Sequence, residues 1–209
     1  MNEFYKLFEK EWSEHWFQYI LDNPDKSWNF NYLSCNPNVT WEIIKNNSHL
    51  PWNYNFFCYN KNMNWDIVLD NQDINWNYSM LSFNPNITFD IVKKFIHLPW
   101  NYNFLSQNKN INWKIIKENP NIKWNYSFFC RNPNITIDIV KENPNIKWDF
   151  TNLSNNKILK WKDIKNNLDL PWNYGLISKN SDITWEIIKK NNEIKYIFDF
   201  YGLCCNKNT

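Results

Sequence analysis

Lysine recurs at one position of a 24-residue period in this chain of 209 residues, at Lys45, Lys93, Lys117, Lys141, Lys165 and Lys189, with Leu69 interrupting the series. Lysines at regular steps along a stacked array could bind the phosphates of a single-stranded nucleic acid, and Lys61, Lys109 and Lys157 could add to them. Acids three residues earlier, such as Glu42 and Asp90, could instead pair with these lysines across one helical turn. We favour this second interpretation and keep phosphate binding as the alternative.

Histidine and cysteine are too sparse to indicate a catalytic or metal site. The histidines are His15, His49 and His97, and the last two lie 48 residues apart. The five cysteines are odd in number and form no C-x-x-C pair, which indicates reduced thiols. The chain contains no P-loop, G-x-G-x-x-G, H-E-x-x-H or nucleophile-elbow motif. We therefore expect no enzyme activity, no metal and no cofactor.

The composition indicates a packed protein rich in Trp and Asn. With 43% hydrophobic and 19% aromatic residues, the chain has more apolar surface to bury than disordered chains have. A net charge of +2 argues against a polybasic coat for nucleic acid or membranes. The N-terminus lacks signal-peptide features, and no run of apolar residues is long enough to span a bilayer. We expect an intracellular protein that is not secreted and does not bind membranes.

A repeat of constant length explains most of the sequence. Seven blocks of 24 residues run from residue 28 to residue 195 without an insertion. Position 1 of every block is a tryptophan that we assign to the core: Trp28, Trp52, Trp76, Trp100, Trp124, Trp148 and Trp172. Position 3 is Phe or Tyr, position 7 is Ser or Cys, and position 9 is always Asn, for example Asn36 and Asn84. The small residue at position 7 predicts close contact between neighbouring blocks, so Cys58 and Cys130 are interpreted as serine replacements.

Each block is predicted to contain two short helices. Thr40, Glu42 and Lys45 place a cap, an acid and a base where a helix over positions 14 to 19 favours them. Lys160 replaces the capping residue in the sixth block, which puts that cap in question. The first half alternates like a strand but also fits a helical face, and we favour a helix over positions 1 to 8. Asn at position 9 is then expected to end this helix in a left-handed conformation.

The expected fold is all-α, an α-solenoid of short helix pairs between degenerate caps. A leucine-rich repeat is the main rival, but its apolar slots are filled here by polar residues such as Asn103 and Asn110. Two glycines are too few for the corners of a parallel β-helix. Residues 1–27 form an N-terminal helical cap with an apolar stripe through Phe4, Phe8, Trp12, Trp16 and Ile20. Residues 196–209 form a C-terminal cap, with a helix over residues 196–201 and a polar tail.

The pattern W-N-Y-x-x-L-S-x-N-P-N-I-T-W-E-I-I-K-x-N resembles the tandem repeats in open reading frames of amoeba-infecting giant DNA viruses related to mimivirus. The resemblance covers residues 28–195 and implies a helical repeat fold, with the host cytoplasm or the virion as the location. It implies no established activity. Because exposed positions vary between blocks while core positions do not, we expect a non-enzymatic scaffold for protein–protein interaction. The alternatives are nucleic-acid binding along the lysines and end-to-end self-association as a virion component, which apolar caps would favour.

Overall fold

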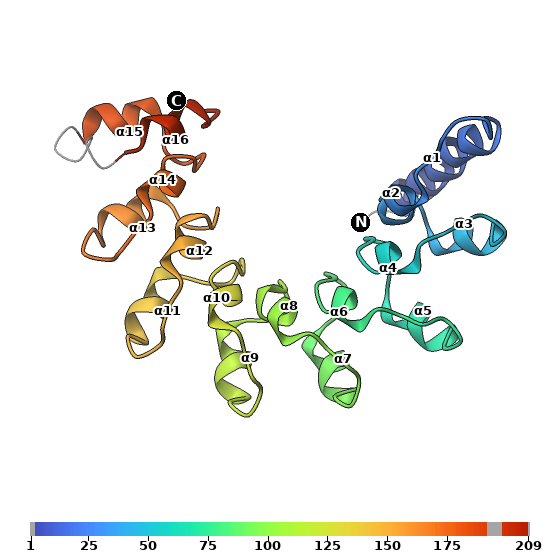
Figure 1. Ribbon diagram of the computed structural model, residues 1–209, viewed down its shortest axis with the longest axis horizontal. Coiled ribbons are helices and arrows are strands. Elements are labelled where there is room, and N and C mark those ends of the chain that lie inside the picture. The colour runs from blue at the N-terminus through green and yellow to red at the C-terminus, as the bar shows by residue number, and fades with distance from the viewer. Residues whose placement is uncertain (1–2, 192–197, 209) are drawn as a thin grey trace. The chain divides into compact units, whose positions relative to one another are not determined.

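The computed structural model describes residues 3–191 and 198–208, within which the chain forms sixteen α-helices and no strand (Figure 1). By its contacts the chain divides into two compact units, residues 1–110 and 111–209, which are described separately. The first unit contains α1 Glu3–Leu21, α2 Phe30–Cys35, α3 Trp41–Asn46, α4 Tyr54–Phe57, α5 Trp65–Asp70, α6 Tyr78–Leu81, α7 Phe89–Lys94 and α8 Tyr102–Gln107. The second contains α9 Trp113–Glu118, α10 Tyr126–Phe129, α11 Ile137–Glu142, α12 Phe150–Ser154, α13 Trp161–Lys165, α14 Tyr174–Ile177, α15 Trp185–Lys190 and α16 Phe200–Cys204.

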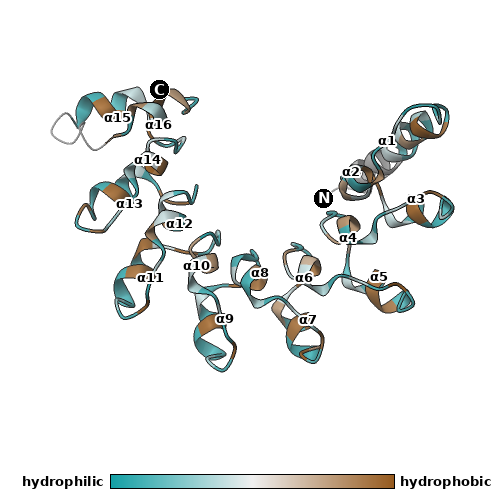
Figure 2. Ribbon diagram, in the orientation of Figure 1, coloured by the Kyte–Doolittle hydropathy of each residue, from teal (hydrophilic) through white to brown (hydrophobic). Residues whose placement is uncertain are grey.

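Both halves of each block are helical, so the predicted helix-pair repeat is confirmed. We call the first helix of a block the A helix, which has an even number, and the second the B helix, which has an odd number. Within each unit the A helices lie side by side in one layer and the B helices in another (Figures 1 and 2). Helices of four to six residues are not stable alone in water. Packing between neighbouring helices therefore supplies their stability.

The A helix begins at position 3, two residues later than predicted. The cause is the Asn or Asp at position 2, whose side chain accepts a hydrogen bond from the backbone two or three residues on, as Asn77 does from Met80 N at 3.0 Å. The tryptophan at position 1 therefore precedes the helix. Its indole N–H donates to a backbone carbonyl five residues earlier, as Trp76 does to Asn71 O at 2.9 Å.

The B helices of the seven blocks begin at position 14, as predicted, and the capping residues act as expected. The Thr40 hydroxyl accepts a hydrogen bond from Ile43 N at 3.2 Å, and Asn64 caps α5 in the same way. Lys160 makes no side-chain cap at α13. Instead, the Asp163 carboxylate accepts from Lys160 N at 2.8 Å, so an acid in a slot that is aliphatic elsewhere replaces the missing cap.

The assigned tryptophans form the core, as predicted, with Trp28 half-buried and the others buried. Trp76, Trp100 and Trp148 each contact aromatic rings of the two preceding blocks. In the first unit, the Trp76 ring lies 5.8 Å from the Tyr54 ring of the preceding block and 5.9 Å from the Trp41 ring two blocks back. Trp148 makes the same two contacts in the second unit, at 5.8 Å to Tyr126 and 5.9 Å to Trp113. Tilted and edge-on aromatic pairs therefore fix the spacing of the stack.

The asparagine at position 9 links neighbouring blocks by hydrogen bonds. Asn84 Nδ2 donates to Cys58 O at 2.7 Å and to Asn60 O at 3.0 Å, both in the preceding block, and its Oδ1 accepts from Asn86 N at 2.9 Å. The same amide group donates to backbone carbonyls of the preceding block at Asn60 and Asn108 in the first unit, and at Asn132, Asn156, Asn180 and Asn206 in the second. These bonds satisfy backbone carbonyls that are buried between blocks.

The expected left-handed conformation at position 9 is wrong. No described residue has a positive φ angle, and Asn36 and Asn108 have φ angles of −66° and −67°. Extended backbone at this position directs the side-chain amide toward the preceding block. The asparagine is invariant because both ends of its amide form hydrogen bonds, not because it tolerates left-handed backbone.

The residue at position 7 is a second polar link between blocks. The Ser82 hydroxyl donates to Tyr78 O at 2.7 Å and accepts from Asn101 N in the next block at 2.9 Å. Cys58 is buried at the same position and accepts a hydrogen bond from the backbone of Asn77. Its thiol therefore takes over the acceptor role of the serine hydroxyl, which supports the interpretation of Cys58 as a serine replacement.

Burial raises the pKa of the Cys58 and Cys130 thiols to about 11. Because the thiolate is the reactive form, we expect both to react with a thiol reagent at pH 8 at least about a hundredfold more slowly than the exposed Cys204 and Cys205. Mass spectrometry of the folded protein after timed labelling measures this difference. Equal labelling of all four in folded protein would contradict the buried assignment.

The two ends of the chain each supply half a block. Phe17 of α1 packs against Trp52 at 5.6 Å, as Trp41 packs against Trp76, and Asn23 Nδ2 donates to Tyr19 O as Asn47 does to Ile43 O. α1 therefore occupies the place of a B helix. The buried face of its described side chains is Ser13, Phe17 and Ile20, which corrects the predicted stripe, since Trp12 is exposed and Trp16 half-buried. The side chains of Phe4 and Phe8 lie outside the described part.

At the other end, α16 is the A helix of an eighth block displaced by two residues. Phe198 takes the position of the repeat tryptophan and packs against Trp161 at 5.5 Å. Asp199 caps α16, and Asn206 donates to Ser178 O and Asn180 O. The predicted helix over residues 196–201 is wrong in its bounds, and residues 196 and 197 lie outside the described part. Among the described residues, no helix is long and apolar enough to cross a membrane.

Candidate binding surface

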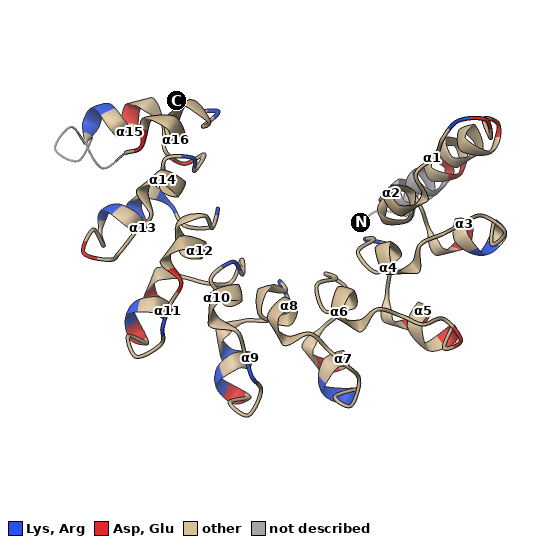
Figure 3. Cartoon of the chain, viewed as in Figure 1, with Lys and Arg blue, Asp and Glu red and all other residues tan. Residues whose placement is uncertain are grey.

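The lysines at position 18 lie on the B helices, and all six are exposed. Figure 3 shows basic residues on α3, α7, α9, α11, α13 and α15, whereas α5 carries only acidic ones. Within each unit these lysines share one layer.

The structure describes one pair between an acid at position 15 and a lysine, and that pair differs from the predicted one. Glu186 lies 3.8 Å from Lys190, four residues on, rather than pairing with Lys189. Lys189 Nζ lies over the Trp185 ring at 5.5 Å, and Lys165 Nζ donates to Asn191 Oδ1 at 2.5 Å. The lysines at position 18 thus have varied local contacts, which does not indicate one common ligand.

Lys61, Lys109 and Lys157 do not extend this series. They lie in the turns that follow α4, α8 and α12, which are A helices. Because A and B helices form different layers, the two sets of lysines belong to different faces of each unit (Figure 3). A single strand of phosphates following the B helices would not meet the second set.

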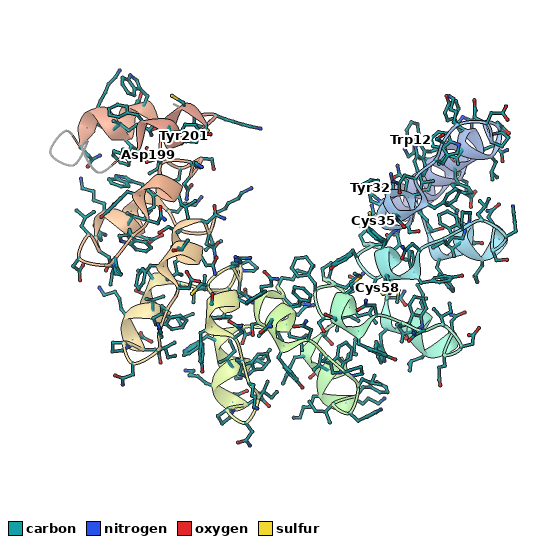
Figure 4. All side chains as sticks on the ribbon, viewed as in Figure 1. Trp12, Tyr32, Cys35, Cys58, Asp199 and Tyr201 are labelled. Atoms are coloured by element: carbon teal, nitrogen blue, oxygen red, sulfur yellow. The ribbon has the colours of Figure 1, made fainter. Side chains whose placement is uncertain are left out.

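A row of exposed aromatic residues lies on the A layer of the first unit. Tyr59 and Phe83 are 38% and 44% exposed, and their rings are 6.1 Å apart. Phe104, half-buried, continues the row at 6.3 Å from Phe83. We call Tyr59, Phe83 and Phe104 the aromatic row. On the same layer Tyr32 extends from α2 and is also exposed (Figure 4).

Sequence reasoning missed the aromatic row because the exposed positions were treated only as variable and were not searched for aromatic residues. The available signal was a change of residue type at one position. Tyr59 and Phe83 occupy position 8, where the other blocks have Cys35, Gln107, Arg131, Asn155 and Lys179. Two neighbouring aromatic residues at an otherwise mainly polar, exposed position indicate a surface feature.

In the second unit, Asp149 replaces the Asn that caps the other A helices of the repeat blocks. Partial burial alone raises the pKa of its carboxyl, but this is outweighed by hydrogen bonds from the Ser127 hydroxyl at 2.5 Å and from the backbone N–H groups of Asn152 and Thr151, and by the charge of Arg131. The pKa of Asp149 is therefore lowered.

A lowered pKa in the folded state means that ionised Asp149 stabilises the fold above its unfolded pKa and that this stability is lost as the pH falls. We expect the variant Asp149→Asn to lack this loss of folding stability at low pH. Urea unfolding of both proteins at pH 7 and pH 3 measures it, with the wild type losing more stability than the variant between these values. An equal loss in both proteins would contradict this role of the carboxylate.

Within the described residues, no group of three or more His, Cys, Asp or Glu side chains is placed to hold a metal ion. Comparisons of the chain with protein-family models, curated proteins and solved structures found no match. Any assignment of function therefore depends on the surfaces of the two units.

Proposed function

We propose that this protein is a non-enzymatic scaffold that binds a protein partner through the aromatic row on its A layer, in a virus-infected host cell. The observation that supports it is the contiguous row formed by the exposed Tyr59 and Phe83 and the half-buried Phe104. Aromatic residues are enriched at the centres of protein interfaces, where they contribute much of the binding energy. Tyr59 and Phe83 lie in the turns that follow α4 and α6, and Phe104 lies on α8. Backbone hydrogen bonds close both turns, from Tyr59 N to Phe56 O and from Phe83 N to Met80 O at 3.1 Å, so little conformational freedom is lost on binding.

Nucleic-acid binding is the second candidate, and the same row gives it a specific basis. Exposed aromatic rings can stack on the bases of a single strand, and Lys61 and Lys109 lie in turns that follow helices of the same layer. The net charge of +2 weakens this candidate, because binding to nucleic acid normally needs a clear excess of basic residues.

An affinity pull-down from host-cell lysate, with and without nuclease, tests the choice. One variant, Tyr59→Asn with Phe83→Gln, gives position 8 residue types found in other blocks and so preserves the fold. A matched variant changes the six lysines at position 18 to Glu. We expect specific partners to persist after nuclease, to disappear with the aromatic variant and to remain with the lysine variant.

Two results would reject the proposal. If the captured partners were lost after nuclease treatment and were also lost with the aromatic variant, the aromatic row would bind nucleic acid. If the same partners bound the aromatic variant but not the lysine variant, the binding surface would lie on the B layer.

End-to-end self-association has support of its own at the C-terminal half block. Phe200 and Tyr201 of α16 are exposed, and Tyr201 extends from the helix in Figure 4. Interior residues equivalent to Phe200, such as Phe150, pack against the tryptophan of the next block. Sedimentation over a hundredfold range of concentration, with Phe200→Asn as the control, tests whether this surface joins copies.

A further inference from the structure

The C-terminal half block exposes an aromatic face that is covered in interior blocks. Phe200, at position 3 of this half block, is 80% exposed, whereas the residue at position 3 is half-buried in all seven complete blocks. Trp185, at position 14 of the seventh block, is 54% exposed, whereas the same position is buried or half-buried in the other six. In the interior these two positions contact the tryptophan of a following block, as Tyr54 and Trp41 contact Trp76. Phe200 and Trp185 therefore form a surface of the kind that holds a repeat tryptophan.

The N-terminal end presents a repeat tryptophan that lacks such a surface. Trp28 is half-buried, whereas the other six position-1 tryptophans are buried. Its ring contacts Tyr19 of α1 at 6.3 Å, and its indole donates to Asn23 O at 2.8 Å, five residues earlier, as in an interior block. The segment from α1 to α2 thus has the arrangement of a B helix followed by an A helix. Because α16 is an A helix, a B helix is the element that the repeat would place next to it.

Hydrogen-bonding groups at the two ends are complementary as well. The carbonyl at position 7 accepts from the position-9 asparagine of the next block, as Cys58 O does from Asn84 Nδ2 at 2.7 Å. Cys204 takes position 7 of the C-terminal half block, where it is exposed and no described side chain donates to its carbonyl. Asn36 takes position 9 of the first block. Its Oδ1 accepts from Asn38 N at 2.8 Å, but its Nδ2 has no acceptor among the described residues. One end therefore offers the acceptor, and the other end the donor, of the same bond.

We propose that the C-terminal end of this protein binds the N-terminal end of a second copy of the chain. In this contact α1 of the second copy lies beside α16, in the place that a B helix takes in the interior. Trp28 of the second copy packs against Phe200 and Trp185, and its Asn36 Nδ2 donates to Cys204 O. The alternation of A and B helices then continues across the junction with the contacts found inside each unit. A contact between two C-terminal ends would bring together two acceptors and no such donor. The proposal rests on the end-to-end association considered above and does not depend on the aromatic row.

Two substitutions each remove one side of this contact. Asn36→Asp keeps the acceptor for Asn38 N and replaces the donor with a negative charge that would face Cys204 O. Because Asn36 Nδ2 has no described acceptor within its own chain, the variant should unfold in urea close to the wild-type midpoint. Phe200→Asn removes a ring that is 80% exposed and so should also leave the fold intact. Each substitution should weaken association at least about tenfold, as expected for a central residue of an interface.

A mixture of the two variants tests the pairing of unlike ends. Sedimentation velocity over about a hundredfold range of concentration should show that the wild type associates and that each variant alone stays monomeric where the wild type associates. The equimolar mixture should form dimers, because Asn36→Asp keeps an intact C-terminal end and Phe200→Asn keeps an intact N-terminal end. The variant Tyr59→Asn with Phe83→Gln should associate as the wild type does, so this test and the test of the aromatic row can fail separately.

Three results would overturn the proposal. The first is a wild type that stays monomeric throughout the range. The second is a wild type that associates while the mixture of variants stays monomeric, which would indicate that like ends bind each other and would leave end-to-end association standing with a different contact. The third is association that folded Asn36→Asp leaves unchanged.

Discussion

Asn84→Asp is expected to destabilise the first unit by at least about 3 kcal/mol, although the two side chains have the same shape. The Asn84 amide donates to two buried carbonyls, and a carboxylate would place acceptors and a negative charge against both. The loss should be smaller at pH 4 than at pH 7, because a buried carboxyl has a raised pKa and its protonated form regains one donor. Urea unfolding at the two pH values measures both effects.

The control for this prediction is Asn75→Asp, which makes the same chemical change at an exposed position nearby. It should alter the free energy of unfolding by less than about 0.5 kcal/mol. If Asn84→Asp cost no more than Asn75→Asp, the hydrogen bonds of position 9 would not hold the blocks together.

Trp76→Ala should cost about 3–5 kcal/mol, the range found when large buried aromatic residues are truncated. The substitution removes ring contacts with Trp41 and Tyr54 and leaves Asn71 O without the indole donor. Because these contacts join three blocks, we also expect a less cooperative unfolding transition in the first unit. Thermal and urea unfolding, followed by circular dichroism, measure both effects.

Trp12→Ala is the matched control in the same unit, since Trp12 is exposed on α1 (Figure 4). It should cost less than about 1 kcal/mol. Similar losses for both variants would show that the position-1 tryptophan contributes general apolar area rather than specific contacts between blocks.

The sequence was sufficient for the architecture because the period repeats the same physical signals seven times. Fixed tryptophans marked the core, and Thr or Asn followed by an acid marked the start of the B helices. The start of the A helices was missed because Asn at position 2 was not recognised as a cap. The role of position 9 was missed for a different reason, since its hydrogen bonds join residues about 24 apart and no local propensity encodes them.

The candidate site was harder to predict, because the repeat pattern identifies constant positions and the site lies at positions that depart from the pattern. The lysines at position 18 are regularly spaced and exposed, but their described contacts differ from one lysine to the next. The aromatic row depends on departures from the pattern, at Tyr59 and Phe83. Only the stacking of blocks brings the rings of Tyr59 and Phe83, which are 24 residues apart in the sequence, to 6.1 Å from each other.

The half blocks at the two ends allow the gene to lose or gain whole repeats while both ends of the stack stay the same. α1 occupies the place of a B helix, and α16 occupies the place of an A helix. The chain between them can therefore lose or gain 24 residues starting at any position of the repeat, because the same residue types still meet at the new junction. Recombination between repeats would therefore conserve folding while deleting or copying individual surfaces. Loss of the second or third block would remove Tyr59 or Phe83 from the aromatic row and leave the repeat period intact, so binding can disappear in such lineages without a change in stability.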